Sequence, residues 1–241
     1  MKSLSENCKS LSGKKPIIIA IDGPAASGKS TTARLLAKRL GYLYLDTGAM
    51  YRALTWKVLK EGVDMRDKKS LAKLAKEIKI RLQSNDEMGS RVFLNGEEIT
   101  FSIRSPQVNK YVSLVSMVKE VREEMVRRQR EMGRKGGIVA EGRDIGTVVF
   151  PKALVKIFLT CSLEERVRRR WKEARERNSF LTKKEIKEEL SRRDKLDRER
   201  EFSPLRKAKD AIVLDNTFLS INETTERVLK IVKNSLQSIN L

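Results

Sequence analysis

The sequence predicts an α/β fold: a five-stranded parallel sheet flanked by helices, with a small antiparallel β insertion and a short helical lid. Three observations indicate this class. Five short apolar runs alternate with helical patterns, as in a layered fold with a parallel sheet. The first run leads directly into a glycine-rich loop. One internal stretch breaks the alternation and carries a hairpin signal.

The five apolar runs are nearly continuous rather than alternating, which is typical of parallel strands that are covered on both faces. They are found at residues 16–21, 42–45, 137–140, 154–159 and 211–214. We expect each of them to form one strand of the central sheet.

Helical patterns separate these strands. Residues 30–40 place apolar side chains on one face, and Gly41 can end that helix. Thr47 is expected to cap the helix that follows the second strand. The last helix carries one apolar stripe, formed by Ile221, Val228, Leu229, Val232 and Leu236. Capping boxes are expected at Ser162–Glu165, Thr182–Glu185 and Ser220–Glu223.

The stretch 63–104 departs from this rhythm. A helical pattern is followed there by two segments with alternating apolar residues, and Asn95-Gly96 is a strong signal for a two-residue hairpin turn. We therefore expect a small antiparallel sheet inserted into the parallel fold. Ser105-Pro106 then begins a helix, and a second helical stretch ends at Met132.

Composition narrows the classes of function. The 241 residues are 39% apolar, enough for a sizeable core, and carry a net charge of +20, which favours anionic partners. Histidine is absent, so neither the commonest general base nor the commonest metal ligand is available. Two distant cysteines without zinc spacing, and no apolar run of membrane length, lead us to expect a cytoplasmic protein without a membrane partner.

Residues 23–30 match the Gly-x4-Gly-Lys-Ser pattern of a phosphate-binding loop, in the required place between a strand and a helix. Such a loop points backbone N–H groups at phosphate oxygens, and the helix start adds its positive dipole end. The alternative is a glycine turn without a ligand. The pattern predicts a P-loop NTPase-type fold and an ATP or GTP site made by Gly23, Pro24, Ala25, Ala26, Ser27, Gly28, Lys29, Ser30 and Thr31.

Within that loop, Lys29 suits the outer phosphates and the hydroxyl of Ser30 suits Mg²⁺. A GTPase is disfavoured, because the guanine-reading Asn-Lys-x-Asp has no better match than Asn109-Lys110-Tyr111-Val112, which lacks the carboxylate.

Three further segments carry a resemblance. "LDTGAMYR" (45–52), "EGRDIGTVVFP" (141–151) and "RRDKLDRER" (192–200) resemble the three acceptor-side signatures of bacterial cytidylate (CMP/dCMP) kinases. With the P-loop they stand in the family order and span nearly the whole chain from about residue 16. The inserted antiparallel sheet also matches that family. One departure is Ser30, where many relatives have glycine.

The resemblance implies a kinase that transfers a phosphoryl group from ATP to CMP or dCMP, with Mg²⁺. It assigns Arg52, Arg143 and Arg200 to the acceptor phosphate, where guanidinium groups bind phosphate bidentately. Asp144 accepts the exocyclic amine of cytosine. The remaining acceptor-side residues that the resemblance implies are Thr47, Tyr51, Ser113, Arg122, Arg193 and Asp197.

Structural alternatives stand beside these assignments. Arg193, Asp197 and Arg200 fall on one helix face and could form a surface ion-pair ladder, worth only about 0.2–0.5 kcal/mol per pair. Asp144 could cap a turn, Arg122 could be one more surface arginine, and Ser113 an ordinary helix serine.

The charge-dense helix 163–177 resembles the lid of this kinase group. Its Arg166, Arg169 and Arg170 are candidates to cover the transferring phosphoryl group, where cations stabilise spreading charge. The alternative is a solvated helix face, since the block contains few apolar residues.

The expected organisation follows from these segments. It has an N-terminal extension (1–15), a core (16–46, 133–162, 185–241), an NMP-binding part (47–132) and a lid (163–184). We expect a monomer that binds no nucleic acid. Rival interpretations are a kinase for UMP or AMP, and an RNA-binding P-loop protein motivated by the net charge; low aromatic content weighs against the latter.

Overall fold

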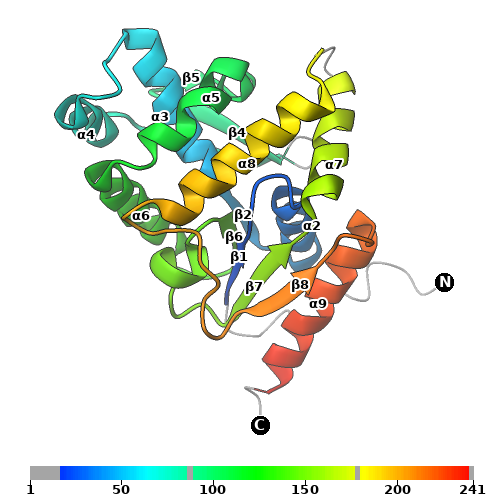
Figure 1. The fold of residues 1–241 in the computed structure, drawn as a ribbon. Coiled ribbons are helices and arrows are strands. Elements are labelled where there is room, and N and C mark those ends of the chain that lie inside the picture. Colours follow the sequence, from blue (N-terminus) through cyan, green and yellow to red (C-terminus); the bar gives the residue numbers. More distant parts are fainter. Residues whose placement is uncertain (1–16, 86–88, 177–179, 239–241) are drawn as a thin grey trace.

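The structure is a computed structural model that describes residues 17–85, 89–176 and 180–238. Its centre is a parallel sheet with the strand order β2-β6-β1-β7-β8 (Figure 1). The five strands confirm the five predicted runs within one or two residues: β1 (Ile18–Asp22), β2 (Leu43–Asp46), β6 (Ile138–Gly142), β7 (Val155–Thr160) and β8 (Ile212–Asp215). The expected N-terminal extension and part of the expected lid lie outside the described residues.

β6 is longer than its apolar run. The run ends at Ala140, but Glu141 and Gly142 remain paired with β1 as partners of Ile21 and Asp22. Strand pairing, rather than apolar character, therefore sets the end of this strand. The extension brings a carboxylate to the carboxyl edge of the sheet, where ligands of such folds bind.

Helices cover both faces of the sheet. α2 (Lys29–Leu40) and α9 (Ile221–Gln237) share one apolar core with the strands, and Val228, Val232 and Leu236 of α9 are buried in it. The predicted stripe is wrong at Ile221, which is 53% exposed. Ile221 is the first residue of the helix, and it lines the cleft described below instead of the core.

The opposite face packs against a larger core that belongs to the helices between residues 47 and 133. In Figure 1 these helices lie on the side of the sheet away from α9. They are α3 (Thr47–Glu61), α4 (Lys68–Glu77), α5 (Pro106–Val115) and α6 (Lys119–Gly133), with the short helical segments η1 (Ser102–Arg104) and η2 (Ile145–Val149).

The antiparallel insertion is confirmed. β3 (Ile80–Asn85), β4 (Gly89–Leu94) and β5 (Glu97–Glu98) form a separate sheet in the order β3-β4-β5. Asn95 and Gly96 both have positive φ angles, 51° and 92°, as the predicted two-residue turn requires. Ser105 caps α5 and Pro106 is its first residue, also as predicted.

Helix caps agree with the sequence at two of the four predicted places. At Ser162–Glu165 only half of the predicted box is present: the N–H of Glu165 donates to the Ser162 hydroxyl at 3.3 Å, but the N–H of Ser162 donates to Thr217. Complete capping boxes are present at Thr182–Glu185 and Ser220–Glu223. Thr47 does not cap α3, however; the carboxylate of Asp46 accepts the N–H of Ala49 at 2.9 Å, while the Thr47 hydroxyl donates to the carbonyl of Glu141. The cap thus belongs to the last residue of β2.

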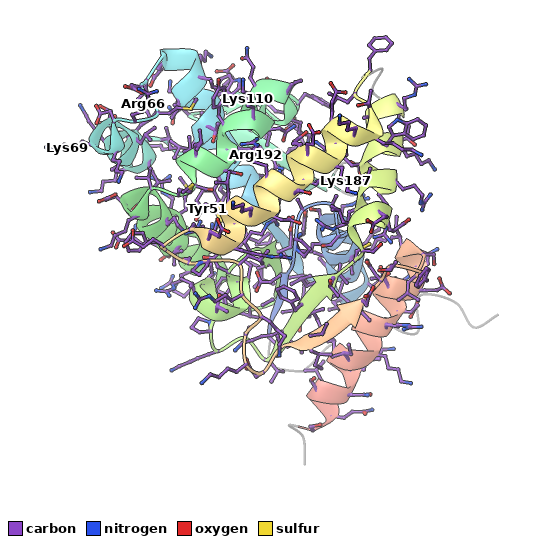
Figure 2. The ribbon with its side chains drawn as sticks, viewed as in Figure 1. Tyr51, Arg66, Lys69, Lys110, Lys187 and Arg192 are labelled. Carbon is purple, nitrogen blue, oxygen red and sulfur yellow. The ribbon has the colours of Figure 1, made fainter. Side chains whose placement is uncertain are left out.

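α7 (Leu163–Glu176) and α8 (Lys183–Glu199) pack against each other beside the glycine-rich loop. α7 is less solvated than its sequence indicates, because Arg166 and Val167 are buried. Figure 2 shows Lys187 and Arg192 along α8, and both are exposed. Among the described residues, no helix is long and apolar enough to cross a membrane.

Candidate active site

A cleft of about 590 Å³ lies at the carboxyl edge of the parallel sheet. Its floor follows from strand register: Asp22 of β1 pairs with Gly142 of β6, and Asp46 of β2 pairs with Glu141. β1 has β6 on one side and β7 on the other, so the chain switches direction there, and such switch points are where parallel sheets bind ligands.

The glycine-rich loop forms one end of the cleft. A Cβ atom at Gly23 would lie 2.1 Å from the carbonyl oxygen of Leu159, so no larger residue fits. Gly28 has φ 91° at the N-cap of α2, a conformation that favours glycine. No side chain caps α2, which leaves its first N–H groups to an anion.

Lys29 is the cation of this end. It is only 4% exposed, and its Nζ donates to the carbonyl of Pro24 at 2.6 Å. Burial, and to a lesser extent the charge of the nearby Arg143, lower the pKa of Lys29 to about 7. An anion that entered the loop would favour the charged form of Lys29 again.

A carboxylate that the sequence analysis missed faces the loop. Glu141 is 5% exposed, and the hydroxyl of Ser30 donates to its Oε1 at 2.6 Å. A sequence signal for Glu141 was available, because this acidic residue directly follows the apolar run 137–140 and begins the segment 141–151. Among the described residues, no cluster of three or more metal-binding side chains is present.

Asp22 is a second missed residue. Its carboxylate accepts the N–H groups of Ile145 and Gly146, at 2.8 and 2.7 Å, and so fixes the start of η2. Burial raises the pKa of Asp22 to about 7. Because Arg143 and Asp144 immediately precede η2, Asp22 helps to orient both of them toward the cleft.

The other end of the cleft is rich in arginine. Arg143 donates to Asp197 at 2.7 Å, and Arg52 reaches Asn109 at 3.5 Å. Burial, together with the charges of Arg52 and Arg143, lowers the pKa of Arg193 to about 9. Three guanidinium groups, from α3, the β6–η2 junction and α8, therefore face one space. An anion bound there would stabilise their positive charges.

Beyond these arginines, Asp144 is held by a buried ion pair. Arg122 donates to Asp144 at 2.5 Å and to the carbonyl of Ser116 at 3.1 Å. Arg122 also lies 5.3 Å from the centre of the Tyr51 ring, and Arg200 lies 3.9 Å from Asp144. Figure 2 shows Tyr51 close to the C-terminal end of α8, from which Arg200 follows.

Unpaired polar atoms gather in this arginine-rich end. Among the described residues, seven buried side-chain nitrogen or oxygen atoms lack a hydrogen-bond partner. Four of them belong to residues that line the cleft: Tyr51 Oη, Arg122 Nε, Arg193 Nε and Arg200 Nη2. Buried polar groups are rarely left unpaired, so this cluster points to a ligand that supplies the missing partners.

The structure brings most of the predicted site residues together. The cleft is lined by Ala25, Ala26, Gly28, Lys29, Ser30, Thr31, Thr47, Tyr51, Arg52, Ser113, Arg122, Arg143, Asp144, Arg169, Arg170, Arg193, Asp197 and Arg200. Gly23, Pro24 and Ser27 lie in the loop behind its surface. Arg166 does not line the cleft; it is 6% exposed and bonded to protein groups.

The other two candidate arginines of α7, Arg169 and Arg170, differ in their partners. Arg169 donates to the carbonyl of Asn216 at 2.8 Å, and the Asn216 amide in turn donates to the carbonyl of Ser27 at 2.9 Å. Within the part of the chain that the structure describes, Arg170 forms an ion pair only with Glu173, at 3.2 Å on its own helix, and its side chain is one-third exposed. Asn216 had no sequence signal, since it follows the last strand without a motif.

Known proteins resemble this chain over most of its length. A family model described as cytidylate kinase matches residues 19–234. The chain is 49% identical over 220 residues to a cytidylate kinase of Bacillus subtilis (strain 168), covering 91% of this chain and 98% of the relative. It is 53% identical over 216 residues to a cytidylate kinase of Geobacillus sp. (strain WCH70), covering 90% and 96%. A crystal structure from Thermus thermophilus aligns at a TM-score of 0.47 with 24% identity, over 92% of this chain and 99% of that one.

Proposed function

This chain belongs to the cytidylate kinase family, and we propose that the two ends of its cleft bind the two nucleotides of that family's reaction. The protein is a kinase that transfers a phosphoryl group from ATP to CMP or dCMP and forms ADP with CDP or dCDP. The observation that carries the site assignment is the cluster of unpaired buried atoms at the end opposite Lys29.

The donor end takes the triphosphate of ATP. The free N–H groups at the start of α2 and the loop backbone bind phosphate oxygens, and Lys29 leaves the Pro24 carbonyl to contact the outer phosphates. Arg169 and Arg170 approach the same end from α7. Their charges would stabilise the phosphoryl group in transfer, because its negative charge spreads over the equatorial oxygens.

The acceptor end takes CMP. Arg52 and Arg143 bind its phosphate, and Arg193 with Asp197 binds the ribose hydroxyls. Asp144 accepts the exocyclic amine of cytosine, with Ser113 and Arg122 beside the ring acceptors. We assign Arg200 to the base end rather than to the phosphate, because it lies next to Asp144 and Tyr51.

Mg²⁺ fits the donor end. Magnesium is commonly held by one or two carboxylates together with substrate phosphates and water. The Ser30 hydroxyl and the Glu141 carboxylate offer two hard oxygen donors side by side, and these are the residues that would hold it. When bound, the ion neutralises charge on the phosphates that are being separated.

Transfer needs no general base in this site. The acceptor is a phosphate oxygen whose second pKa is near 6, so it is mostly ionised at neutral pH. The absence of histidine is therefore no obstacle. The work of the protein is to align two anions and to neutralise their repulsion, which is the task of the fixed cations.

We further propose that residues 47–132 form the acceptor-binding part and 163–184 the lid.

The test is ADP release measured across CMP, dCMP, UMP and AMP, for the wild-type chain and for Asp144→Asn. Asparagine can present its amide nitrogen where cytosine presents its amine, so we expect the CMP-to-UMP ratio of kcat/KM to fall about tenfold, as for a lost base-specific pair. Asp64→Asn, an exposed carboxylate in a turn, is the control. Faster turnover of AMP than of CMP by the wild type would contradict the base assignment.

A further inference from the structure

The peptide group of Ala25, in the middle of the phosphate loop, is held from both sides. Its N–H donates to Oδ1 of Asp194 at 3.1 Å, and its carbonyl accepts from Nη1 of Arg166 at 3.1 Å. Arg166 and Asp194 also form an ion pair with each other. The next residue, Ala26, has φ 58°, which is unusual for a residue other than glycine.

This arrangement, which we call the Ala25 clamp (Ala25, Arg166 and Asp194), is buried. Arg166 is 6% exposed and Asp194 is 5% exposed. Two guanidinium nitrogens of Arg166 hold the clamp: Nε donates to the carbonyl of Cys161 at 3.2 Å, and Nη1 donates to both Ala25 and Asp194. Buried ion pairs of this kind add little net stability compared with apolar packing, so their value often lies in fixing one geometry.

Apolar contacts reinforce the clamp. Ala25 packs in a small cluster with Val167 of α7 and with Ile186 and Leu190 of α8. The loop is therefore fastened to two helices by side-chain packing as well as by hydrogen bonds. Any shift of α8 relative to the sheet must move the Ala25 peptide or break these contacts.

α8 also carries acceptor-side residues. Arg193 and Asp197 are four positions apart and line the cleft, whereas Asp194 lies about 100° from Arg193 and about 60° from Asp197 around the helix and bonds to the loop. One rigid turn of helix thus touches the acceptor space on one side and the donor loop on the other.

We propose that Arg166 and Asp194 are positioning residues that couple the seating of CMP against α8 to the geometry of the phosphate loop. Acceptor binding fixes Arg193 and Asp197, α8 settles, and the clamp sets the Ala25 peptide for the triphosphate. By reciprocity, ATP in the loop tightens CMP by the same factor. This inference rests on the proposed placement of both nucleotides.

The test compares Asp194→Asn with Glu124→Gln in the full-length chain. Glu124 is a matched control: it is a largely buried carboxylate paired with Arg128 at 2.6 Å, on α6, and it does not line the cleft. Asparagine keeps an oxygen for the Ala25 N–H but removes the charge that holds Arg166. The affinity for a non-hydrolysable ATP analogue is measured by calorimetry, with and without CMP.

We expect CMP to tighten the analogue at least about fivefold in the wild type, the lower end of typical coupling. Asp194→Asn should bring this factor close to 1 and lower kcat about tenfold, while the affinity for CMP alone stays within about twofold. Glu124→Gln should lower the melting temperature and leave the coupling factor unchanged. A wild-type factor of 1, or an unchanged factor in Asp194→Asn, overturns the proposal.

Two further measurements keep the outcome decisive. If Asp194→Asn does not fold, Arg166→Lys replaces it, because a lysine retains the charge but cannot serve the Ala25 and Cys161 carbonyls and Asp194 together; retained coupling in that variant also overturns the proposal. Lys29→Met separates the two levels of inference. If Lys29→Met loses turnover while Asp194→Asn keeps the same coupling factor as Glu124→Gln, the proposal about the clamp is overturned and the proposed function stands. If Lys29→Met keeps turnover, the proposed function is overturned.

Discussion

The donor and acceptor ends of the cleft are built in opposite ways. The phosphate loop of the donor end is one continuous segment, residues 23–31, and its cation Lys29 already has a partner in the Pro24 carbonyl. The acceptor end takes its side chains from α3, α5, α6, the junction between β6 and η2, and α8 with the residue that follows it, and several of its buried atoms have no partner. Backbone geometry therefore prepares the donor loop for its ligand, whereas the acceptor end is completed only when its ligand binds.

The largest expected effect comes from removing the donor-end cation. Lys29→Met keeps the length of the side chain but offers no charge to the outer phosphates. We expect kcat to fall by about 10²–10³-fold, the usual loss when one preorganised donor to a developing charge is removed. A coupled ADP-release assay at saturating CMP checks it, with circular dichroism to confirm the fold. Wild-type turnover would reject the role of the loop.

A smaller effect is expected from a conservative change at the acceptor end. Arg143→Lys keeps the positive charge but loses the planar fork that binds phosphate and Asp197 together. One lost charge-assisted hydrogen bond corresponds to about 10–100-fold in kcat/KM for CMP. The KM for ATP should change far less. Arg192→Lys, at an exposed position of α8, is the control, and equal losses with both nucleotides would erase the distinction between the ends.

The smallest effect concerns the cost of keeping Lys29 buried. Its pKa is about 7 in the folded protein against 10.5 for the free side chain, mainly because of burial. Between these values the unfolded chain binds more protons, so this group makes wild-type stability rise with pH from about 7 to 10.5 and contributes no slope below 7.

Lys29→Met removes that slope. At pH 6.5 we expect the variant to gain on the order of 1 kcal/mol in the free energy of unfolding, because relief from burying the cation exceeds the loss of its hydrogen bond to Pro24. The gain should shrink steadily by pH 9.5. Urea unfolding at both pH values measures it. A difference between variant and wild type that does not vary with pH would show that Lys29 titrates normally.

Much of the fold was predictable because its signals are local. Continuous apolar runs gave three of the five core strands within one residue and β1 and β6 within two, and Asn95-Gly96 placed the hairpin because only such residues tolerate two successive positive φ angles. The cap of α3 was not predictable in the same way. Asp46 and Thr47 are both good capping residues, and the contact between Thr47 and the Glu141 carbonyl decided between them.

The candidate site divides along the same line. The residues of the phosphate loop follow from one short pattern, and the acceptor residues were found only through a resemblance that spans the chain. Arg166 could not be separated from Arg169 and Arg170 in the sequence, since all three stand in one charged block. In the structure Arg166 faces the Ala25 peptide, whereas the other two line the cleft.

The sequence by itself determined the strand–loop–helix of the donor end, the antiparallel insertion and the class of ligand, because these depend on backbone conformation and on charge within a few residues. The tertiary structure alone decided which charged side chains are buried together. Glu141 beside Ser30, Asp22 under η2, and Asp194 against Ala25 lie 111, 123 and 169 positions from their partners. Contacts at such separations are fixed by strand order and helix packing, which no local pattern encodes.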